Sequence, residues 1–163
     1  MGRNKSGSGG DGAARSAYDR ALGMLARREY SQRELRTRLE RAGCDEEESG
    51  AAIARLRDQD YQDDHRFGEM VLRARVTQGY GPERVHAELR AHGLGDDAIR
   101  NLIAAAAVDW AALAAAQLRK KYGVRPPADY AARAKRAAFL SRRGFPAETV
   151  RIVVHSEVGD ASD

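Results

Sequence analysis

The sequence predicts an all-α protein built from three tandem three-helix repeats, stacked as an elongated curved array. Apolar side chains recur three and four residues apart along nearly the whole chain, as they do on one face of a helix. Alanine and leucine dominate the apolar residues and aromatic residues make up only 6%, a composition that favours helices over strands. An L-x-x-x-G pattern also recurs, with glycines 50 and 51 residues apart, at Leu39/Gly43, Leu89/Gly93 and Leu140/Gly144. A fixed period of this size indicates stacked supersecondary units.

The first repeat begins with a helix whose predicted apolar face is Tyr18, Ala21, Leu22 and Leu25. Its second helix lies in RREYSQRELRTRLERAG, residues 27–43. There Ser31 and Glu34 have the spacing of a capping box, in which each side chain binds the other residue's backbone N–H. Gly43 has the position of a left-handed residue after the helix. A third helix is expected to start at Asp45, followed by three glutamates in its first turn.

The second repeat reproduces this arrangement, because YGPERVHAELRAHG, residues 80–93, aligns without a gap on residues 30–43. The tyrosine, leucine and glycine positions coincide, and Pro82 takes the favoured first helical position. The helix before this stretch has the predicted apolar face Phe67, Met70, Val71 and Ala74, and the helix after it has Ile99, Leu102 and Ile103.

The third repeat begins with a helix lined by Trp110, Leu113, Ala114 and Leu118. After a GVRPP break, its second helix ends in FLSRRG, and Pro146 opens a last helix that turns three valines inward. We expect repeats at 16–60, 61–107 and 108–157, with a flexible tail at 1–15 and a C-terminal tail at 158–163. Because a unit of this size buries little by itself, neighbouring repeats are expected to share a core.

Composition and charge exclude several classes of protein. Cys44 is the only cysteine, so no internal disulfide and no thiolate metal cage can form. No apolar run approaches a membrane span, and we expect a cytoplasmic monomer without a membrane contact. The net charge of +4 makes an acidic partner plausible. Arginine outnumbers lysine, which suits phosphate or carboxylate recognition and also fits the codon usage of a GC-rich genome.

Three stretches in this order resemble the RecX family of bacterial recombination regulators. They are ALGMLARREYSQRELRTRLERAG, QGYGPERVHAELRAHG and KRAAFLSRRGFPAETVRIVV, and the acidic DQDYQDDHRF link between the first two is also similar to the family's. Together they span about residues 17–155. The resemblance implies three tandem three-helix repeats and a non-enzymatic protein that binds the RecA recombinase filament on single-stranded DNA. It further implies damping of the RecA ATPase and of strand exchange, and thus a role in DNA repair and the SOS response. Tyr130 departs from the pattern, one position out of register with Tyr30 and Tyr80.

Charge distribution suggests where such a partner would bind. Residues 117–143 carry nine basic side chains against the single acid Asp129, whereas residues 45–64 carry eight acids against two arginines. A filament of an acidic protein on DNA would attract the basic end. The contact candidates in the third repeat are Arg119, Lys120, Lys121, Arg125, Arg133, Lys135, Arg136, Arg142 and Arg143. Those in the first repeat are Arg27, Arg28, Tyr30, Arg33 and Arg36. Lysine and arginine that merely fill solvated helix surfaces would produce the same pattern.

The sequence favours no enzyme, because no nucleophile–base arrangement, metal-ligand spacing or phosphate loop is visible, and no cofactor is expected. An alternative hypothesis is a stand-alone single-stranded DNA-binding helical module. In that case the basic helices would contact phosphates, and Tyr30, Tyr80, Tyr122 and Tyr130 would stack on bases.

Overall fold

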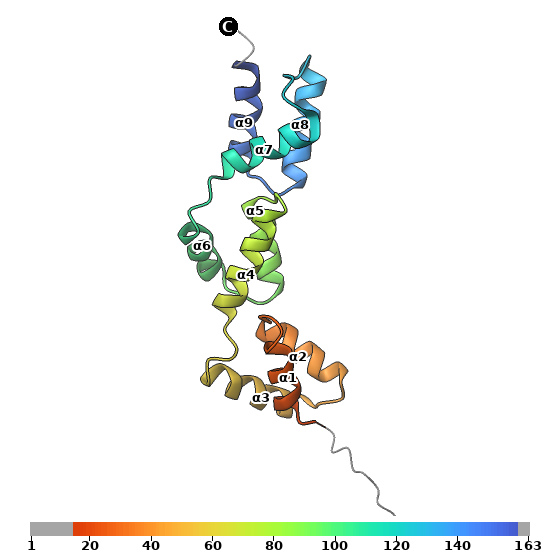
Figure 1. Ribbon diagram of the computed structural model, residues 1–163, viewed down its shortest axis with the longest axis vertical. Helices are drawn as coiled ribbons and strands as arrows, with labels where there is room; N and C mark the ends of the chain where they lie inside the picture. Colours follow the sequence, from red (N-terminus) through yellow and green to blue (C-terminus); the bar gives the residue numbers. More distant parts are fainter. Residues whose placement is uncertain (1–14, 160–163) are drawn as a thin grey trace, which may run out of the picture.

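The computed structural model describes residues 15–159, and within that range the chain forms nine α-helices and no strand (Figure 1). The helices are α1 (Ala17–Leu25), α2 (Gln32–Arg41), α3 (Glu46–Asp58), α4 (Asp64–Thr77), α5 (Pro82–Ala91), α6 (Asp96–Ala105), α7 (Trp110–Tyr122), α8 (Tyr130–Arg142) and α9 (Ala147–Gly159). Repeat 1 (α1–α3), repeat 2 (α4–α6) and repeat 3 (α7–α9) follow one another along the long axis, as predicted. The expected tails lie almost entirely outside the described residues.

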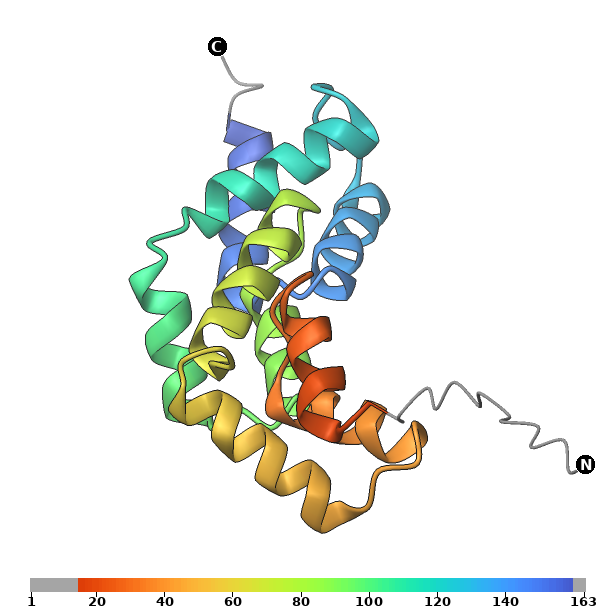
Figure 2. The same cartoon turned by 60° about the horizontal axis from the view of Figure 1, so that its bottom comes forward.

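The buried apolar side chains form three clusters, one inside each repeat. Leu39, Leu89 and Leu140, the leucines of the repeated pattern, are each 0% exposed and lie at the centre of their own cluster. The expectation of a core shared between neighbours is wrong. Only the partly buried Trp110, among the residues assigned to these clusters, packs against two of them, the second and the third. Each repeat therefore closes its own small core, and other contacts hold the stack together. Figure 2 shows the helices of the three repeats from a second direction.

The second helix of every repeat ends in the same way. Gly43, Gly93 and Gly144 have φ angles of 91°, 89° and 88°, in the left-handed region that glycine adopts without steric cost. In each case the residue after the glycine donates its N–H to the carbonyl of the pattern leucine, as Cys44 does to Leu39 at 3.0 Å. This is the Schellman motif that the sequence predicts, repeated three times.

The predicted capping box of α2 is only half correct. Ser31 Oγ accepts the N–H of Glu34 at 3.1 Å, as expected. The carboxylate of Glu34 does not reciprocate, since it binds Arg28 at 2.6 Å and Arg38 at 3.3 Å. The starts at Asp45 and Pro82 agree with the prediction, because Asp45 caps α3 and Pro82 is the first residue of α5.

The buried face of α4 differs from the predicted one. Phe67, Val71 and Leu72 are buried, whereas Ala74 is exposed. Gly68 explains the difference, because a Cβ atom there would lie 2.6 Å from the Leu102 side chain of α6. The glycine allows the Leu102 side chain of α6 to approach α4 on the face that also buries Leu72.

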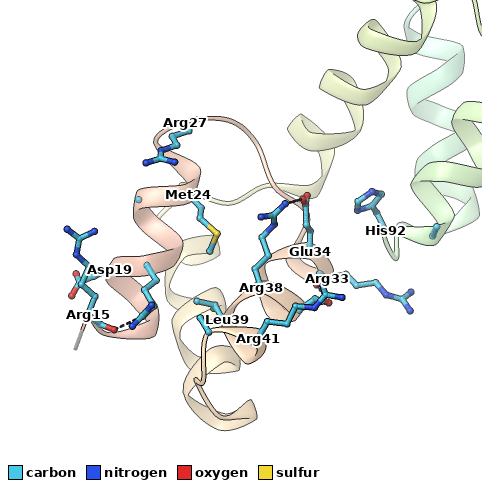
Figure 3. A pocket seen from close by; sticks show the side chains of 15 residues that line it. Arg15, Asp19, Met24, Arg27, Arg33, Glu34, Arg38, Leu39, Arg41 and His92 are labelled. Carbon is cyan, nitrogen blue, oxygen red and sulfur yellow. Dashed lines mark hydrogen bonds and ion pairs between the residues drawn. The ribbon is translucent and has the colours of Figure 1, made fainter. Parts of the chain in front are cut away.

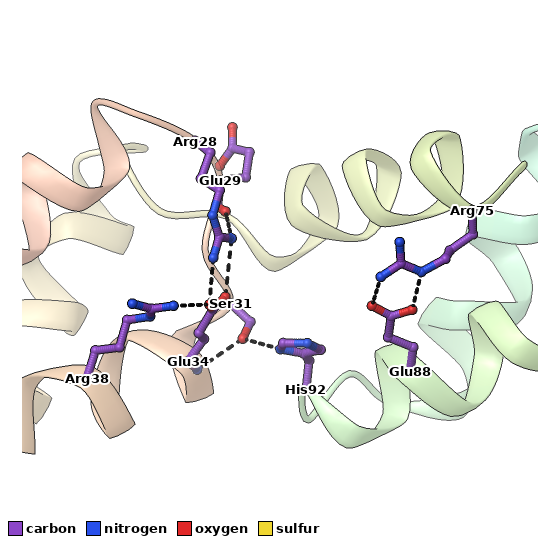
Figure 4. A network of polar contacts seen from close by, with 8 residues as sticks. All are labelled: Arg28, Glu29, Ser31, Glu34, Arg38, Arg75, Glu88 and His92. Atoms are coloured by element: carbon purple, nitrogen blue, oxygen red, sulfur yellow. Dashed lines mark hydrogen bonds and ion pairs between the residues drawn. The ribbon is translucent and has the colours of Figure 1, made fainter. Parts of the chain in front are cut away.

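Side chains make the interface between repeats 1 and 2. Ser31 Oγ lies 2.9 Å from Nδ1 of His92, at the C-terminal end of α5, and Figure 4 shows the two facing each other across the gap. Arg66 donates to Glu29 at 2.9 Å. A Cβ atom at Gly93 would meet only the Arg33 side chain, at 3.9 Å. The glycine end of α5 thus contacts the start of α2 through side chains.

The interface between repeats 2 and 3 includes direct hydrogen bonds between backbone groups, in addition to side-chain contacts. The N–H of Gly81 donates to the carbonyl of Arg143 at 2.8 Å, and the N–H of Glu83 donates to that of Gly144 at 3.0 Å. A Cβ atom at Gly81 would lie 2.3 Å from the Gly144 carbonyl oxygen, and one at Gly144 would lie 2.7 Å from the Arg84 nitrogen. Here the glycine end of α8 meets the start of α5 at a distance that only glycine permits.

Candidate interaction surfaces

Repeat 3 presents most of the predicted basic contact residues to solvent. We call the exposed ones the repeat-3 basic surface: Arg119, Lys120, Lys121, Arg125, Arg133, Lys135 and Arg142. The first five come from the end of α7, the following loop and the start of α8, which Figure 1 places at the outer end of the molecule. The last two lie further along α8, toward repeat 2.

Two other candidates in repeat 3 are structural. Arg136 is only 6% exposed, pairs with Glu157 at 2.8 Å and donates to the carbonyl of Arg125 at 2.8 Å, so it joins α8 to α9 and to the preceding loop. Arg143 donates to the carbonyls of Gln78 and Gly79 in repeat 2. Both guanidinium groups hydrogen-bond to groups of the protein itself, so we leave these two residues out of the repeat-3 basic surface.

In repeat 1, Arg28 and Tyr30 also form internal contacts, and Figure 4 shows Arg28 directed at Glu34. Tyr30 is 8% exposed, and the Arg28 guanidinium covers its ring at 3.6 Å from the centroid. The hydrogen bond from Arg28 to Glu34 raises the pKa of Arg28, as expected for a cation held by a carboxylate. Tyr30 therefore has no free face for a base, and Arg28 neutralises a carboxylate of its own chain. Arg27, Arg33 and Arg36 remain exposed.

The four tyrosines proposed as stacking platforms differ in accessibility. Arg84 and Arg143 cover Tyr80 at 4.3 and 4.2 Å, and Tyr122 packs edge-on against Phe139 at 5.9 Å. Tyr130 alone of the four is largely exposed, at 79%. It lies at the start of α8, three residues before Arg133. An aromatic ring beside cations is the arrangement that single-stranded nucleic acids use for stacking and phosphate contact.

Repeat 1 also holds a basic groove that the sequence analysis did not predict. We define the repeat-1 groove as the hollow of about 900 Å³ between α1 and α2, which Ala91 and His92 of repeat 2 border on one side (Figure 3). Of the arginines that line this groove, Arg27 and Arg33 are contact candidates of the sequence analysis, whereas Arg15, Arg20 and Arg38 are not. The i, i+7 spacing of Arg20 and Arg27 was a usable signal, although nothing in the sequence indicated that α2 would face that side of α1.

The described residues contain no assembled catalytic or metal-binding group. No cluster of three or more histidine, cysteine, aspartate or glutamate residues suited to a metal ion occurs between residues 15 and 159. His65 and His86 each lie near one carboxylate, Glu69 at 3.7 Å and Asp96 at 3.4 Å, as isolated pairs. Over the same range no single helix has the length and apolar character needed to cross a membrane, although α6 and α7, bent by 77°, meet the criterion as a pair.

The acidic residues between 45 and 64 are largely engaged in local structure. Asp45 and Asp63 cap α3 and α4, and Asp64 accepts the backbone N–H of Gln32 at 3.0 Å. The fold and these surfaces define a tandem array of three-helix units that offers charged surfaces for binding.

The comparisons with known proteins identify which array this is. Three domains of the RecX family match the chain in order: the first three-helix domain at residues 17–56, the second at 63–103 and the third at 108–154. The chain is 40% identical over 141 residues to the regulatory protein RecX of Xanthomonas campestris pv. campestris, covering 86% of this chain and 87% of that protein. It is 45% identical over 134 residues to the regulatory protein RecX of Acidithiobacillus ferrooxidans, covering 82% and 85%. The chain therefore belongs to the RecX family of regulatory proteins.

Solved structures agree on the fold. A crystal structure of RecX from Lactobacillus salivarius superposes with a TM-score of 0.72 at 19% identity, covering 86% of this chain and 94% of that one. A crystal structure of a regulatory protein RecX superposes with a TM-score of 0.71 at 23% identity, covering 84% and 69%.

Proposed function

We propose that this protein binds the RecA filament on single-stranded DNA and modulates it, mostly by inhibiting ATP hydrolysis, strand exchange and filament growth. The observation that carries the proposal is membership of the RecX family across all three repeats, with 40–45% identity to the two regulatory proteins compared above. The protein would act as a monomer in the cytoplasm, within recombinational repair and SOS control.

The elongated array suits a ligand that touches successive subunits of a filament. Once the protein is bound to one subunit, its binding to the next subunit is intramolecular and proceeds at a high effective concentration. Several weak contacts therefore add up to tight binding. Such a ligand inhibits by binding one arrangement of the subunits better than another, and this needs no catalytic residue. The repeat-3 basic surface is the contact that we favour, because its cations are exposed and the filament carries acidic protein and phosphate groups.

The test is ATP hydrolysis by the cognate RecA on single-stranded DNA, with substoichiometric amounts of this protein. We expect the rate and the filament length to fall. An unchanged rate of ATP hydrolysis at micromolar concentrations of this protein would contradict the proposal. The Lys120→Glu/Arg133→Glu variant should inhibit less with unchanged helicity. A matched variant, Arg73→Glu/Arg90→Glu, alters two exposed arginines of repeat 2 and should inhibit as the parent does.

Tyr130 favours a second candidate function, direct binding of single-stranded DNA by repeat 3. Binding to bare oligothymidylate and to the RecA–DNA filament across salt concentrations separates the two. Much tighter binding to the filament supports the first function. A steep salt dependence on bare DNA, lost after charge reversal of Arg119, Lys120 and Lys121 and reduced in Tyr130→Ala, supports the second.

A further inference from the structure

The repeat-1 groove carries an excess of positive charge that the described residues, 15–159, do not neutralise. Six arginines and two acids line it: Arg15, Arg20, Arg27, Arg33, Arg38, Arg41, Asp19 and Glu34. Glu34 is already bound by Arg28 and Arg38, and Asp19 accepts the hydroxyl of Ser16 at 2.8 Å. Within residues 15–159, Arg15, Arg27, Arg33 and Arg41 take part in no ion pair. The groove therefore favours an anionic ligand.

Cations border the groove from both helices. On the α1 side Arg20 and Met24 are four residues apart on one helical face, and Arg27 lies in the turn that follows the helix. On α2, Arg38 and Arg41 are neighbours on one face. Figure 3 shows Met24 and Leu39 directed into the space between the two helices. An arginine fork matches a carboxylate or a phosphate.

The surface between the cations distinguishes among anions. It is formed by Gly23, Met24 and Ala42 over the buried Leu39. Among the described residues that line the groove, the one aromatic ring is the imidazole of His92, which packs against Phe67 at 4.6 Å. A nucleic acid strand gains much of its affinity from bases stacked on aromatic rings. The one ring here, that of His92, is already held by Phe67 and Ser31. Methionine and alanine give aliphatic side chains an adaptable apolar surface. The arrangement fits a segment with carboxylates at its edges and aliphatic side chains at its centre.

We propose that the repeat-1 groove binds an acidic, aliphatic-rich segment of a partner protein. The chain's own N-terminal segment lacks the complementary charge, because residues 1–14 contain Arg3 and Lys5 against the single acid Asp11. The last helix, α9, lies at the opposite end of the array from repeat 1 (Figure 1). The proposal does not depend on the partner being RecA, so it stands or falls separately from the filament function.

The test uses a fluorescent peptide of glutamate, leucine and alanine, whose binding to the full chain is followed by anisotropy. We expect saturable binding that weakens with salt, and no binding of the same peptide with lysine in place of glutamate. Arg27→Glu/Arg41→Glu should weaken binding by about tenfold or more, because repulsion replaces attraction. Arg73→Glu/Arg90→Glu makes the same charge change in repeat 2, outside the groove, and should bind the peptide as the parent does.

A second pair of variants tests the groove by volume alone. A Cβ atom at Gly23 has nothing within 4 Å, so Gly23→Leu fills the groove without disturbing the fold and should weaken peptide binding. Gly50→Leu is the matched control, since Gly50 lies in α3 of the same repeat, outside the groove and with equally open space. Circular dichroism verifies that both variants stay folded.

Three results would overturn the proposal. Equal peptide affinity in the parent, Arg27→Glu/Arg41→Glu and Gly23→Leu would place the binding elsewhere. Oligothymidylate that displaces the peptide and loses affinity in the same variants would make the groove a nucleic acid site. Self-association of the parent that disappears in Arg27→Glu/Arg41→Glu would make the occupant a second copy of this chain. Filament inhibition by the parent is measured in parallel, and its presence or absence changes none of these conclusions.

Discussion

The two interfaces between repeats are alike in the helix ends that meet but differ in the chemical groups that make the contact. In both, the glycine end of a second helix meets the start of the second helix in the preceding repeat. Between repeats 1 and 2 the contact is made by the side chains of Ser31 and His92. Between repeats 2 and 3 it is made by backbone groups, from Gly81 to Arg143 and from Glu83 to Gly144. Side chains can change rotamer and still touch, whereas paired backbones fix both helices, so the second interface should be the more rigid.

The largest expected effect comes from the glycines. Gly144→Ala should lower the free energy of unfolding by about 1–2 kcal/mol because of the left-handed backbone at this position. The clash with Arg84 should lower it by a further ~1–3 kcal/mol. Gly43→Ala carries the same backbone cost without a neighbour, because a Cβ there has nothing within 4 Å. Urea unfolding of the full chain measures both, and equal losses would mean that the close approach at Gly144 contributes nothing.

Arg143 should give the next effect. Arg143→Met removes the hydrogen bonds to the Gln78 and Gly79 carbonyls and should cost roughly 1.5–3 kcal/mol, the usual range for hydrogen bonds from a charged donor. Arg143→Lys retains the charge but lacks the planar fork. If thermal unfolding shows the lysine variant to be as stable as the parent, charge rather than hydrogen-bond geometry holds the interface.

At the first interface the expected effect is smaller. Ser31→Ala removes the α2 cap and the contact with His92, for a loss of about 0.5–2 kcal/mol. Ser16→Ala removes a cap of the same kind from α1, together with the hydrogen bond from Ser16 to Asp19, and no contact of Ser16 within residues 15–159 reaches another repeat. It therefore serves as a reference without a contact between repeats. The difference between the two variants in chemical denaturation estimates the contact between repeats. No difference would mean that the Ser31–His92 contact adds no stability.

The Arg66–Glu29 pair should give the smallest effect. Both side chains are partly exposed, so Arg66→Ala is expected to cost only about 0–1 kcal/mol, and less at high salt. Arg57→Ala is the reference, because Arg57 pairs only with its exposed neighbour Asp58. Because Arg66 also donates to the carbonyls of Asp60 and Tyr61, Glu29→Ala tests the ion pair separately. A loss from Glu29→Ala well above that of the reference, unchanged by salt, would show that this ion pair stabilises the first interface more than its exposure indicates.

Local signals explain most of what was predicted correctly. The leucine and the glycine of each repeated pattern lie within five residues of each other, so sequence alone can report both the buried stripe and the left-handed end. The buried face of α4 was predicted wrongly because it depends on a contact with a distant segment. Ala74 and Leu72 are both plausible on periodicity, and the choice between them depended on Gly68 meeting Leu102, a residue of α6.

The predicted contact residues show the same difference between local signals and contacts with distant segments. A count of charges located the exposed cations of repeat 3, but it could not show that Arg136 pairs with Glu157 or that Arg143 reaches carbonyls in repeat 2. Those partners lie 21 and 65 residues away along the chain. The repeat-1 groove was missed because its two walls are separate helices whose charged faces meet only after folding.

The sequence by itself determined the helices, their threefold repetition and the family, because each depends on residues close together or on a spacing repeated along the chain. Only the tertiary structure decided that the three cores are separate, that backbone groups pair directly at one interface and not at the Ser31–His92 contact of the other, and which arginines remain free. The physical reason is that a cation has the same charge whether it is solvated or bound. Its neighbours in space, contributed by distant segments, determine whether it stabilises the fold or remains available to a partner.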